Sequence, residues 1–506
     1  MDYKLKQFRF FKFDFYENMA VTTAFVVFGY TCFRAGLLSI THDESLTYFL
    51  YVRSSLKDIL SYSGEITSNN HLLNTLLMKL SVAFFGNSEF VLRIPALIGH
   101  LLYLVGTFQI LRLFLNRTKL ALGFGLMATN PFLLDFFSCA RGYSLGLGFI
   151  TLGLYYFFRR LESSDSSFHT RNNILALIML TLSVLSNLSF IYVYAPVAGI
   201  LIMVEIKDAL TVAHCSRKAF TKQINKRVIM PLFFSAFCLS LIYNPVTFVK
   251  IRNYVANYGS TEGFWAGTIT SLLQSVFYGK DYGTSQAILL VRIFIIMVIG
   301  LSAFIFLALF FKKNLSMKIH KYLWPMVVIL FFAAISMYIQ FAIFGVLYPI
   351  DRAAIYLLPL FLIMFLVLWE YSNTLRNNYV KTITSGLFYA ATIAMLLHNL
   401  LCLNITHYYI WKYDASTKKA MKKVYDLTSS ETNRKYRMGI NWVFEPSTNY
   451  YILKNQMFWM EWTHRGGPDD IYDYYYLREE DKRIARKYHL KQIESYLLPG
   501  TYLAVP

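Results

Sequence analysis

Two adjacent carboxylates, Asp43 and Glu44, come directly after the first long apolar stretch of the chain, in the segment Thr41-His42-Asp43-Glu44. Carboxylates at a membrane surface are costly where they lose water, because burial disfavours the charged form. With His42 or Glu65 the pair could hold a divalent cation, although two adjacent carboxylates seldom make a complete site. The alternative interpretation is that both acids end a helix and stay solvated.

More polar groups follow in three segments that are far apart in the sequence. The first continues the loop of the acidic pair through Asn70 and His71. It ends in the stretch Phe85-Gly86-Asn87-Ser88-Glu89 and Arg93. The other two are Ala140-Arg141-Gly142-Tyr143-Ser144 and Tyr348-Pro349-Ile350-Asp351-Arg352. The topology predicted from loop charge brings all three to the same face of a membrane, which scattered solvated loop ends would not require.

The composition defines the kind of scaffold that must position these groups. The chain has 506 residues, of which 56% are hydrophobic and 15% are charged. Soluble domains carry about a quarter charged residues, so a soluble enzyme and a disordered scaffold are both disfavoured. The net charge of +20 fits the Lys and Arg that collect in cytoplasmic loops. With no helix-turn-helix, zinc-finger or RNP-like signature, nucleic acid is not an expected partner.

The apolar residues fall in blocks long enough to cross a bilayer core of about 30 Å. We therefore predict an all-α polytopic membrane protein with about 11 transmembrane helices. The predicted spans lie roughly at 19–40, 90–115, 119–137, 143–158, 174–188, 190–206, 228–249, 286–311, 322–346, 353–369 and 383–403.

The number of spans depends on how the apolar stretch from Ile174 to Ile206 is divided. As one helix it would reach about 50 Å, too long for a bilayer without strong tilt. Asn187 and Pro196 suggest a break, and the alternative is two short helices with a turn near Ser186–Ser189. If the stretch forms two helices, about 22 basic loop residues lie on one side of the membrane and about 8 on the other. A single helix would move every later loop to the opposite side and remove this difference. We therefore predict a cytoplasmic N-terminus and an extracytoplasmic C-terminus.

The sequence divides into two predicted domains. Residues 1–403 form the transmembrane domain, whose first outer loop, about 41–89, carries the acidic pair and an interfacial helix from Leu72 to Phe85. Residues 404–506 are polar and Tyr-rich, and we predict a small extracytoplasmic α/β domain. Its expected elements are a helix over Asp414–Leu427, strands over Met438–Phe444 and Tyr472–Leu477, a helix over Glu479–Tyr488, and a final strand over Thr501–Val505. This region contains none of the five cysteines, so neither a disulfide framework nor a zinc site is expected.

Together these segments resemble the GT-C superfamily of polytopic glycosyltransferases, in the branch of protein O-mannosyltransferases and the bacterial lipid A aminoarabinose transferase. The matching features are the Asp43-Glu44 pair after the first helix, interfacial helices in the first loop, and the segments FGNSEFVLRIPA, ARGYSL and YPIDR. The resemblance covers about residues 20–370. One departure is that Asn70-His71-Leu72-Leu73 stands where many relatives have His-Pro-Pro, which bears on the acceptor class more than on the fold.

The resemblance implies transfer of a sugar from a polyprenyl-phosphate donor to a hydroxyl acceptor, with inversion at the anomeric carbon. Asp43 would be the general base, and Glu44 would orient the acceptor or raise the pKa of Asp43. Arg141 and Arg352 would bind the donor phosphate, and Arg93 would do so or pair with Glu89. The remaining candidates are Tyr143 and Tyr348 as donors of a hydrogen bond to the phosphate, and His42, Glu65, Asn70 and His71 as acceptor or supporting groups.

Each of these roles has a simpler alternative. The tyrosines could belong to the interfacial aromatic belt, the arginines could contact lipid headgroups, and His71 could be an ordinary loop residue. The rival function is a polytopic transporter or lipid flippase, which usually carries ionisable residues near the bilayer midplane and inverted repeats. Here the paired acids lie in a loop, and no repeat is clear. The expected partners are membrane lipids, a polyprenyl-phosphate sugar and an acceptor glycan, lipid or protein, and the expected location is a bacterial cytoplasmic membrane.

Overall fold

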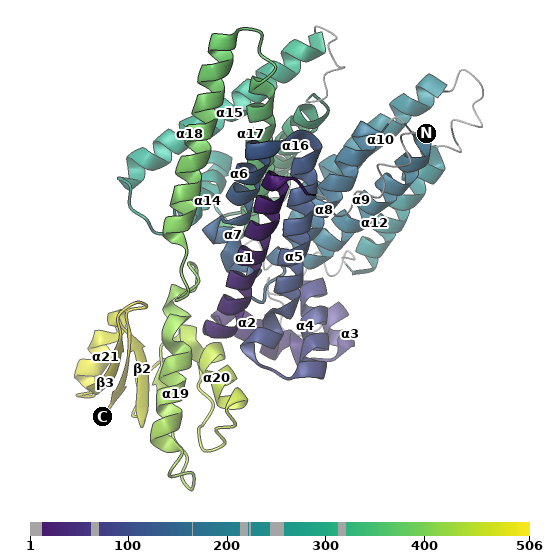
Figure 1. The fold of residues 1–506 in the computed structure, drawn as a ribbon. Coiled ribbons are helices and arrows are strands. Elements are labelled where there is room, and N and C mark those ends of the chain that lie inside the picture. The colour runs from purple at the N-terminus through teal and green to yellow at the C-terminus, as the bar shows by residue number, and fades with distance from the viewer. Residues whose placement is uncertain are drawn as a thin grey trace. The chain divides into compact units, whose positions relative to one another are not determined.

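The structure is a computed structural model that describes residues 13–61, 70–163, 165–212, 221, 224–242, 258–311 and 320–506. Its contacts divide the chain into two compact units (Figure 1). Unit 1 comprises Met1–Tyr30, Leu97–Phe137 and Tyr143–Leu403. Unit 2 comprises Thr31–Ala96, Ser138–Gly142 and Asn404–Pro506. Two long helices, α1 (Phe15–Leu37) and α5 (Glu89–Phe114), have residues in both units.

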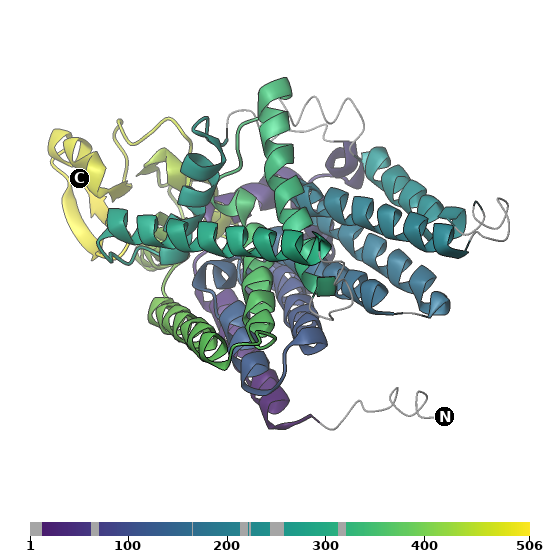
Figure 2. The ribbon, with the colours of Figure 1, turned by 90° about the horizontal axis from the view of Figure 1, so that it is seen from above.

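Unit 1 is built from helices, and every predicted span falls on one of them, on α1 or α5, or on the bent pair formed by α6 and α7. The helices are α6 (Arg117–Ala128), α7 (Pro131–Phe137), α8 (Tyr143–Glu162), α9 (Ser166–Ser186), α10 (Ile191–Val212), α12 (Met230–Ile242), α14 (Thr270–Phe277), α15 (Thr284–Phe311), α16 (His320–Phe344), α17 (Leu357–Ser372) and α18 (Asn378–Cys402). Helices α8, α9, α10 and α12 lie side by side, as the blue to teal ribbons of Figure 2 show.

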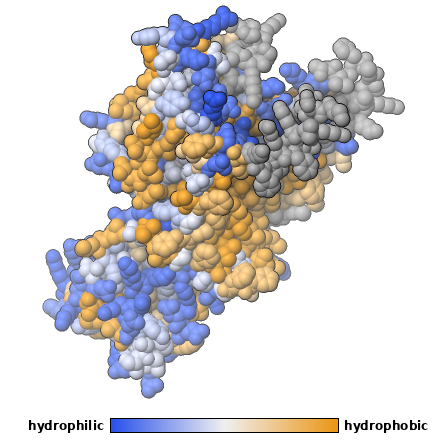
Figure 3. Space-filling view, in the orientation of Figure 1, coloured by the Kyte–Doolittle hydropathy of each residue, from blue (hydrophilic) through white to orange (hydrophobic). Residues whose placement is uncertain are grey.

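Seven helices among the described residues are long and apolar enough to cross a membrane, or eight if α6 and α7, which meet at 61°, form one broken span. The predicted number was 11, and the difference lies in α8, α12 and α17. Helix α17 has 16 residues, and α8 ends in Arg159, Arg160 and Glu162. Helix α12 has 13 residues, and positions 243–249 of its predicted span lie outside the described residues. Hydrophobic side chains cover much of the visible face of the helices in Figure 3. The chain is therefore an integral membrane protein, and the predicted helical fold class is confirmed.

The stretch from Ile174 to Ile206 forms two helices, as predicted. Helix α9 ends at Ser186, and a short 3-10 turn, η3 (Leu188–Phe190), leads into α10. The side chain of Asn187 begins this turn by accepting the backbone N–H of Ser189 at 3.0 Å. Pro196, the other suggested break, lies inside α10. The break is thus made by a polar side chain that replaces helical hydrogen bonds, and not by the proline.

Unit 2 combines short helices of the first loop with a four-stranded sheet. The first loop contains α2 (His42–Thr47), the π-helical η2 (Tyr48–Val52), α3 (Leu56–Ser61) and α4 (Leu72–Phe85). The tail contains η7 (Lys412–Ser416), α19 (Thr417–Thr428), β1 (Met438–Ile440), η8 (Trp442–Phe444), α20 (Glu445–Lys454), β2 (Tyr474–Arg478), α21 (Lys482–Lys487), β3 (Lys491–Tyr496) and β4 (Thr501–Val505). The sheet order is β1-β2-β4-β3, with β1 and β2 parallel and the other pairs antiparallel.

Most predicted elements of the tail are present, and two were missed. Helix α20 and strand β3 occupy segments for which no element was predicted, and the strand expected over Met438–Phe444 turns into η8 after Ile440. The main core of unit 2 is shared by the first loop and the tail. It includes Ile40, Tyr48, Val52, Met78, Leu92 and Ala140 together with Met421, Phe444, Tyr450, Tyr451 and Leu503. The acidic pair is thus held on a scaffold to which the tail contributes.

Candidate functional site

The acidic pair occupies the first turn of the short helix α2. Thr41 is the residue before the helix, and its hydroxyl accepts the backbone N–H of Glu44 at 3.3 Å. The Glu44 carboxylate in turn accepts the backbone N–H of Thr41 at 2.9 Å. These reciprocal bonds form a capping box, which satisfies two backbone donors at the start of the helix and fixes where it begins. The orientations of Asp43 and Glu44 follow from this start.

Glu44 points into the protein, where it forms an ion pair with Arg93. The Nε and Nη2 atoms of Arg93 each donate to one Glu44 oxygen at 2.8 Å, and neither side chain has exposed surface. The backbone N–H of Ala140 adds a third bond to Glu44 at 2.6 Å. Burial raises the pKa of Glu44, but the charge of Arg93 and these hydrogen bonds lower it more, so the pKa lies below its ordinary value. Glu44 is therefore an ionised, fully engaged group.

The remaining donors of Arg93 are also occupied. Its Nη1 atom donates to the carbonyls of Ala35 and Leu38, both at 2.9 Å, and Nη2 donates to Ser39 at 2.7 Å. A guanidinium has five N–H groups, and all five of Arg93 have acceptors. These five bonds occupy the groups with which Arg93 would bind a donor phosphate. Its expected alternative partner, Glu89, contacts Lys454 and Lys418 instead.

Asp43 lies on the same helix but beside a different arginine. The carboxylate of Asp43 lies 3.6 Å from the Nη2 atom of Arg141. The Nη1 atom of Arg141 donates to the Thr47 hydroxyl at 3.2 Å, and that hydroxyl donates to the Asp43 carbonyl at 2.8 Å. The Asp43 side chain keeps 11% of its surface exposed, whereas that of Arg141 keeps 1%. A carboxylate and a guanidinium that are 98 positions apart in the sequence are thus held next to each other within unit 2.

Asp414 supports this arrangement and was not among the predicted site residues. Its carboxylate accepts the backbone N–H of His42 at 2.7 Å and the Ser447 hydroxyl at 2.9 Å. Burial, with a smaller contribution from the charge of Asp43, raises the pKa of Asp414 to about 8. One sequence signal could have identified it: Asp414 is the first acid after the last predicted span, as Asp43 is after the first.

The other predicted residues of the first loop that the structure describes are hydrogen-bonded or buried within the protein. The ring of His42 is hydrogen-bonded through Nδ1 to the carbonyl of Val443 at 2.7 Å. Asn70 donates to the carbonyl of Ile59 at 3.2 Å, and His71 stands at the start of α4. Asn70 and His71 are both buried. Glu65 lies outside the described residues.

Tyr143, Tyr348 and Arg352 belong to unit 1. Tyr143 begins α8 and is buried, with its ring 4.8 Å from that of Phe136. Tyr348 exchanges two backbone hydrogen bonds with Ser260, and the guanidinium of Arg352 lies over the ring of Tyr258 at 5.2 Å.

The residue before Arg352 is strained. Asp351 has a φ of 46°, and its side chain accepts the Ser275 hydroxyl at 3.3 Å. Its backbone N–H donates to the Ser271 hydroxyl at 3.0 Å. Burial raises the pKa of Asp351. A non-glycine residue in this conformation persists only where its surroundings hold it, so the two serines of α14 fix the backbone that presents Arg352.

An apolar cavity of about 700 Å³ lies within unit 1. Its walls come from α14, α15, α16, α17 and α18 and from the C-terminal end of α6. Nearly all of the lining side chains are Leu, Ile, Val, Phe, Met or Ala. The few polar ones include Asn130, His398 and Asn399. A long hydrocarbon chain is the ligand chemistry that such a lining suits.

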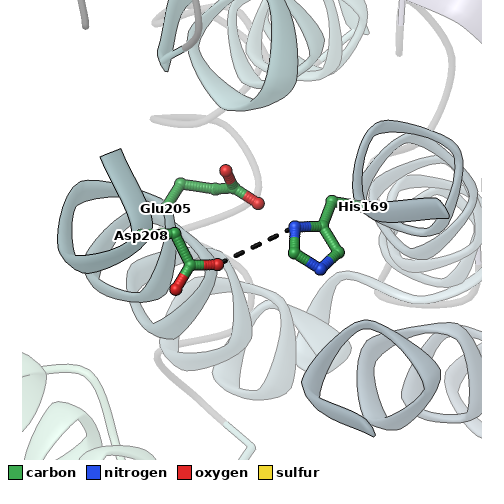
Figure 4. Close-up of side chains that lie close together, drawn as sticks. All are labelled: His169, Glu205 and Asp208. Atoms are coloured by element: carbon green, nitrogen blue, oxygen red, sulfur yellow. Dashed lines mark ion pairs between the residues drawn. The ribbon is translucent and has the colours of Figure 1, made fainter. Parts of the chain in front are cut away.

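The acidic pair does not offer a joint set of metal ligands, because both oxygens of Glu44 are bound by Arg93. One group of metal-ligand type occurs among the described residues, formed by His169, Glu205 and Asp208 of unit 1 (Figure 4). Arg160 contacts both carboxylates at 2.6 Å, and Arg227 lies 3.6 Å from Glu205. Two guanidinium groups thus already neutralise the two carboxylates. We interpret this group as an ion-pair network that joins the ends of α8, α9 and α10.

No protein-family model and no curated protein matches the chain. Among solved structures, ArnT from Cupriavidus metallidurans is similar in two states. The state bound to undecaprenyl phosphate has 9% identity and a TM-score of 0.44, with 96% of this chain and 97% of ArnT covered. The apo state has 10% identity and a TM-score of 0.47, with 96% of each chain covered.

The oligosaccharyltransferase of Archaeoglobus fulgidus, in a complex with Zn and sulfate, is also similar. It has 14% identity and a TM-score of 0.46, with 96% of this chain and 73% of that chain covered. ArnT is an aminoarabinose transferase, and both proteins are GT-C glycosyltransferases, the superfamily that the sequence motifs resemble.

Proposed function

We propose that this chain is an integral-membrane glycosyltransferase that moves a sugar from a polyprenyl-phosphate donor to a hydroxyl acceptor. The observation that carries the proposal is that the Asp43 carboxylate lies 3.6 Å from Nη2 of Arg141. Glu44, the other acid of the same helix, is buried in its ion pair with Arg93. The pairing of Asp43 with Arg141 offers one proton acceptor and one phosphate-binding group side by side, which is what the reaction requires. The acceptor is a hydroxyl of a glycolipid, a surface glycan or a protein.

In this proposal Asp43 is the general base. Its carboxylate takes the proton of the acceptor hydroxyl while the hydroxyl oxygen attacks the anomeric carbon. The bond from that carbon to the phosphate oxygen breaks on the opposite side, and its electron pair leaves with the polyprenyl phosphate. Attack and departure on opposite sides invert the configuration. The guanidinium of Arg141 stabilises the negative charge that grows on the phosphate, because its planar fork matches two phosphate oxygens.

The proposed roles of Glu44 and Arg93 differ from the roles expected of them from the sequence. Their ion pair holds α2 against the backbone of residues 35–39 and 140, so both act by positioning Asp43. Asp414 does the same from the tail, through the N–H of His42. Arg352, Tyr348 and Tyr143 stay candidates for the donor phosphate, and Asn70, His71 and Glu65 for the acceptor side.

The hydrocarbon part of the donor fits the apolar cavity of unit 1. A polyprenyl chain cannot leave the bilayer, and a cavity lined by α14 to α18 offers it a binding surface inside the membrane unit. We further propose that the N-terminus is cytoplasmic, that residues 404–506 are an extracytoplasmic domain and that the membrane is a bacterial cytoplasmic membrane. A reporter fused after Pro506 tests this orientation, since activity of a cytoplasm-only reporter would contradict it.

The test of the function uses the purified full chain in proteoliposomes, supplied with polyprenyl-phosphate sugars and an envelope extract as acceptor. Transfer of labelled sugar is expected from the unaltered protein. In Asp43→Asn the rate falls by roughly 10²–10⁴-fold with unchanged thermal unfolding. The matched control is Asp426→Asn, which changes an exposed acid of α19. Equal transfer by Asp43→Asn would reject Asp43 as the base. Flux of a lipid across the bilayer without any transfer would reject the transferase in favour of a transporter.

A further inference from the structure

Two tryptophans of the tail are exposed next to the helix that carries Asp43. Trp442 has 53% of its surface exposed and Trp462 has 52%. The ring of Trp442 meets the ring of His42 edge-to-face at 6.2 Å, and the ring of Trp462 meets that of Phe49 in the same way at 5.5 Å. Large aromatic side chains are usually buried, so two that stay half exposed in fixed positions call for an explanation.

The spacing of the two contacts is set by one continuous helical segment. His42 and Phe49 are seven residues apart on α2 and η2, which corresponds to about 10 Å along a helix axis and to nearly the same side of it. His42 immediately precedes Asp43 in the sequence. The two tryptophans therefore contact the side of this helical segment that His42 and Phe49 share, and the segment also carries Asp43.

Hydrogen bonds of neighbouring residues hold the backbone at both tryptophans. Trp442 begins η8, and the carbonyl of its neighbour Val443 is bonded to His42 at 2.7 Å. Thr463, the neighbour of Trp462, exchanges two hydrogen bonds with the side chain of Asn449 on α20, at 2.9 and 3.0 Å. Because the backbone on which each ring stands is fixed, little conformational freedom remains to be lost when a ligand binds.

Charged groups accompany the two rings. Glu445 follows Trp442 by three residues, Arg465 follows Trp462 by three residues, and these two form an ion pair at 3.4 Å. The ion pair thus joins the two segments that carry the rings. Glu461 is also exposed. Aromatic faces beside carboxylate and guanidinium groups match a sugar ring, whose C–H face packs on an aromatic ring while its hydroxyls take hydrogen bonds.

A lipid surface is the other ligand that exposed tryptophans often contact. The charged neighbours argue against it, since carboxylate and guanidinium groups beside both rings would have to lose water together with them. We propose that Trp442 and Trp462 form a carbohydrate-binding platform that holds the glycan of the acceptor next to Asp43. This inference rests on the proposed function and narrows the acceptor to a glycan or a glycolipid headgroup.

The experiment measures binding without relying on transfer. The full chain, in detergent and in nanodiscs, is exposed to hydroxyl radicals with and without oligosaccharides released by mild acid from the envelope of cells that contain the protein. Oxidation is then read residue by residue by mass spectrometry. We expect the oligosaccharides to protect Trp442 and Trp462, and not Phe458, which is 73% exposed in the same tail. Protection that appears on moving from detergent to nanodiscs, and not with oligosaccharide, would show a lipid contact and overturn the platform. No protection in either setting would overturn it as well.

Variants connect the binding to the reaction. Trp442→Ala and Trp462→Ala should each raise the KM for the glycan acceptor by about five- to tenfold, with little change in the KM for the donor. Trp442→Phe and Trp462→Phe should keep most of the binding, because they keep an aromatic face. Phe458→Ala is the matched control and should behave as the unaltered protein.

The two proposals can fail separately. Oligosaccharide that still protects both tryptophans in Asp43→Asn, where transfer is lost, would support both the platform and the base. If oligosaccharide protected both tryptophans but the unaltered protein transferred no sugar, the proposed transferase activity would be rejected and the carbohydrate-binding platform would be kept. Transfer to a glycan with equal acceptor KM in the alanine variants would reject the platform alone.

Discussion

The carboxylate of Glu44 and the guanidinium of Arg93 meet in two hydrogen bonds of 2.8 Å, and neither side chain has any exposed surface. The pair therefore divides the two neighbouring acids between two tasks. Glu44 is used to hold the helix in place, and Asp43 keeps contact with the outside through 11% of its side-chain surface. Two carboxylates with adjacent positions in the sequence thus have different environments because one of them is fully neutralised.

Loss of this pair should destabilise the protein. Glu44→Gln leaves the charge of Arg93 buried without its counter-ion, which costs about 3–5 kcal/mol. The measurement is the thermal unfolding midpoint of the purified protein in detergent. Lys482→Ala, which removes a pair between two exposed side chains, is the control and should leave the midpoint nearly unchanged. An unaltered midpoint in Glu44→Gln would contradict a positioning role for the pair.

Arg141→Lys tests the phosphate contact. Lysine keeps the positive charge but has no planar fork to match two oxygens, so the KM for the polyprenyl-phosphate donor should rise by roughly tenfold or more. The acceptor KM should change little. Arg437→Lys changes an exposed arginine of the tail and serves as the control. If donor KM is the same in Arg141→Lys and in the unaltered protein, Arg141 does not bind the donor phosphate.

Asp414 should make stability depend on pH. Burial raises its pKa from an ordinary 3.8 to about 8, so the folded protein holds a proton that the unfolded chain releases at lower pH. Asp414 therefore contributes stability that is present below about pH 4 and is lost as the pH rises to about 8.

The measurement is the unfolding midpoint between pH 5 and pH 9, compared with that of Asp414→Asn, whose amide cannot ionise. The unaltered protein should lose stability across this range relative to Asp414→Asn. Asp426→Asn, at an exposed position, should follow the unaltered protein. Parallel curves for the unaltered protein and Asp414→Asn would mean that Asp414 titrates in its ordinary range.

The apolar cavity should determine how long a donor chain the protein accepts. Ala334 on α16 lines the cavity, and Ala334→Trp would fill part of it. We expect a higher KM for a donor with a long polyprenyl chain and little change for a donor with a short one. Phe332→Trp places the same side chain at an exposed position of the same helix. If Ala334→Trp changed the KM for the long-chain and the short-chain donor equally, the cavity would not be the binding site of the donor's hydrocarbon chain.

The sequence was sufficient to locate the helices of the membrane portion. Long apolar blocks depend on local composition alone, and the predicted break at Asn187 was found because a polar side chain interrupts an apolar stretch there. Helix α20 was missed because its sequence, EPSTNYYILK, carries little helical periodicity, and its packing against α2 supports it. The Pro446 near its start was the available signal.

The partners of charged residues were less predictable. Arg93 was expected at a phosphate or at Glu89, which lies four residues before it, and it pairs with Glu44, 49 residues away. Such a pairing depends on how α1, α2 and α5 are packed, and nothing in the local sequence specifies it. Asp43 and Arg141 were assigned to one site from the predicted topology and the family resemblance, and their separation of 3.6 Å is a property of the tertiary structure.

The hydrogen bond from His42 to Asp414 spans 372 positions of the chain. During synthesis the helix that bears Asp43 therefore leaves the ribosome long before the residue that completes its first turn. The hydrophobic core around this helix can also form only after the tail has been synthesised, since Phe444, Tyr450 and Leu503 belong to it. An unfinished chain would hold the membrane helices without the hydrogen bonds that position the proposed base, so we expect the proposed activity only when translation is nearly complete.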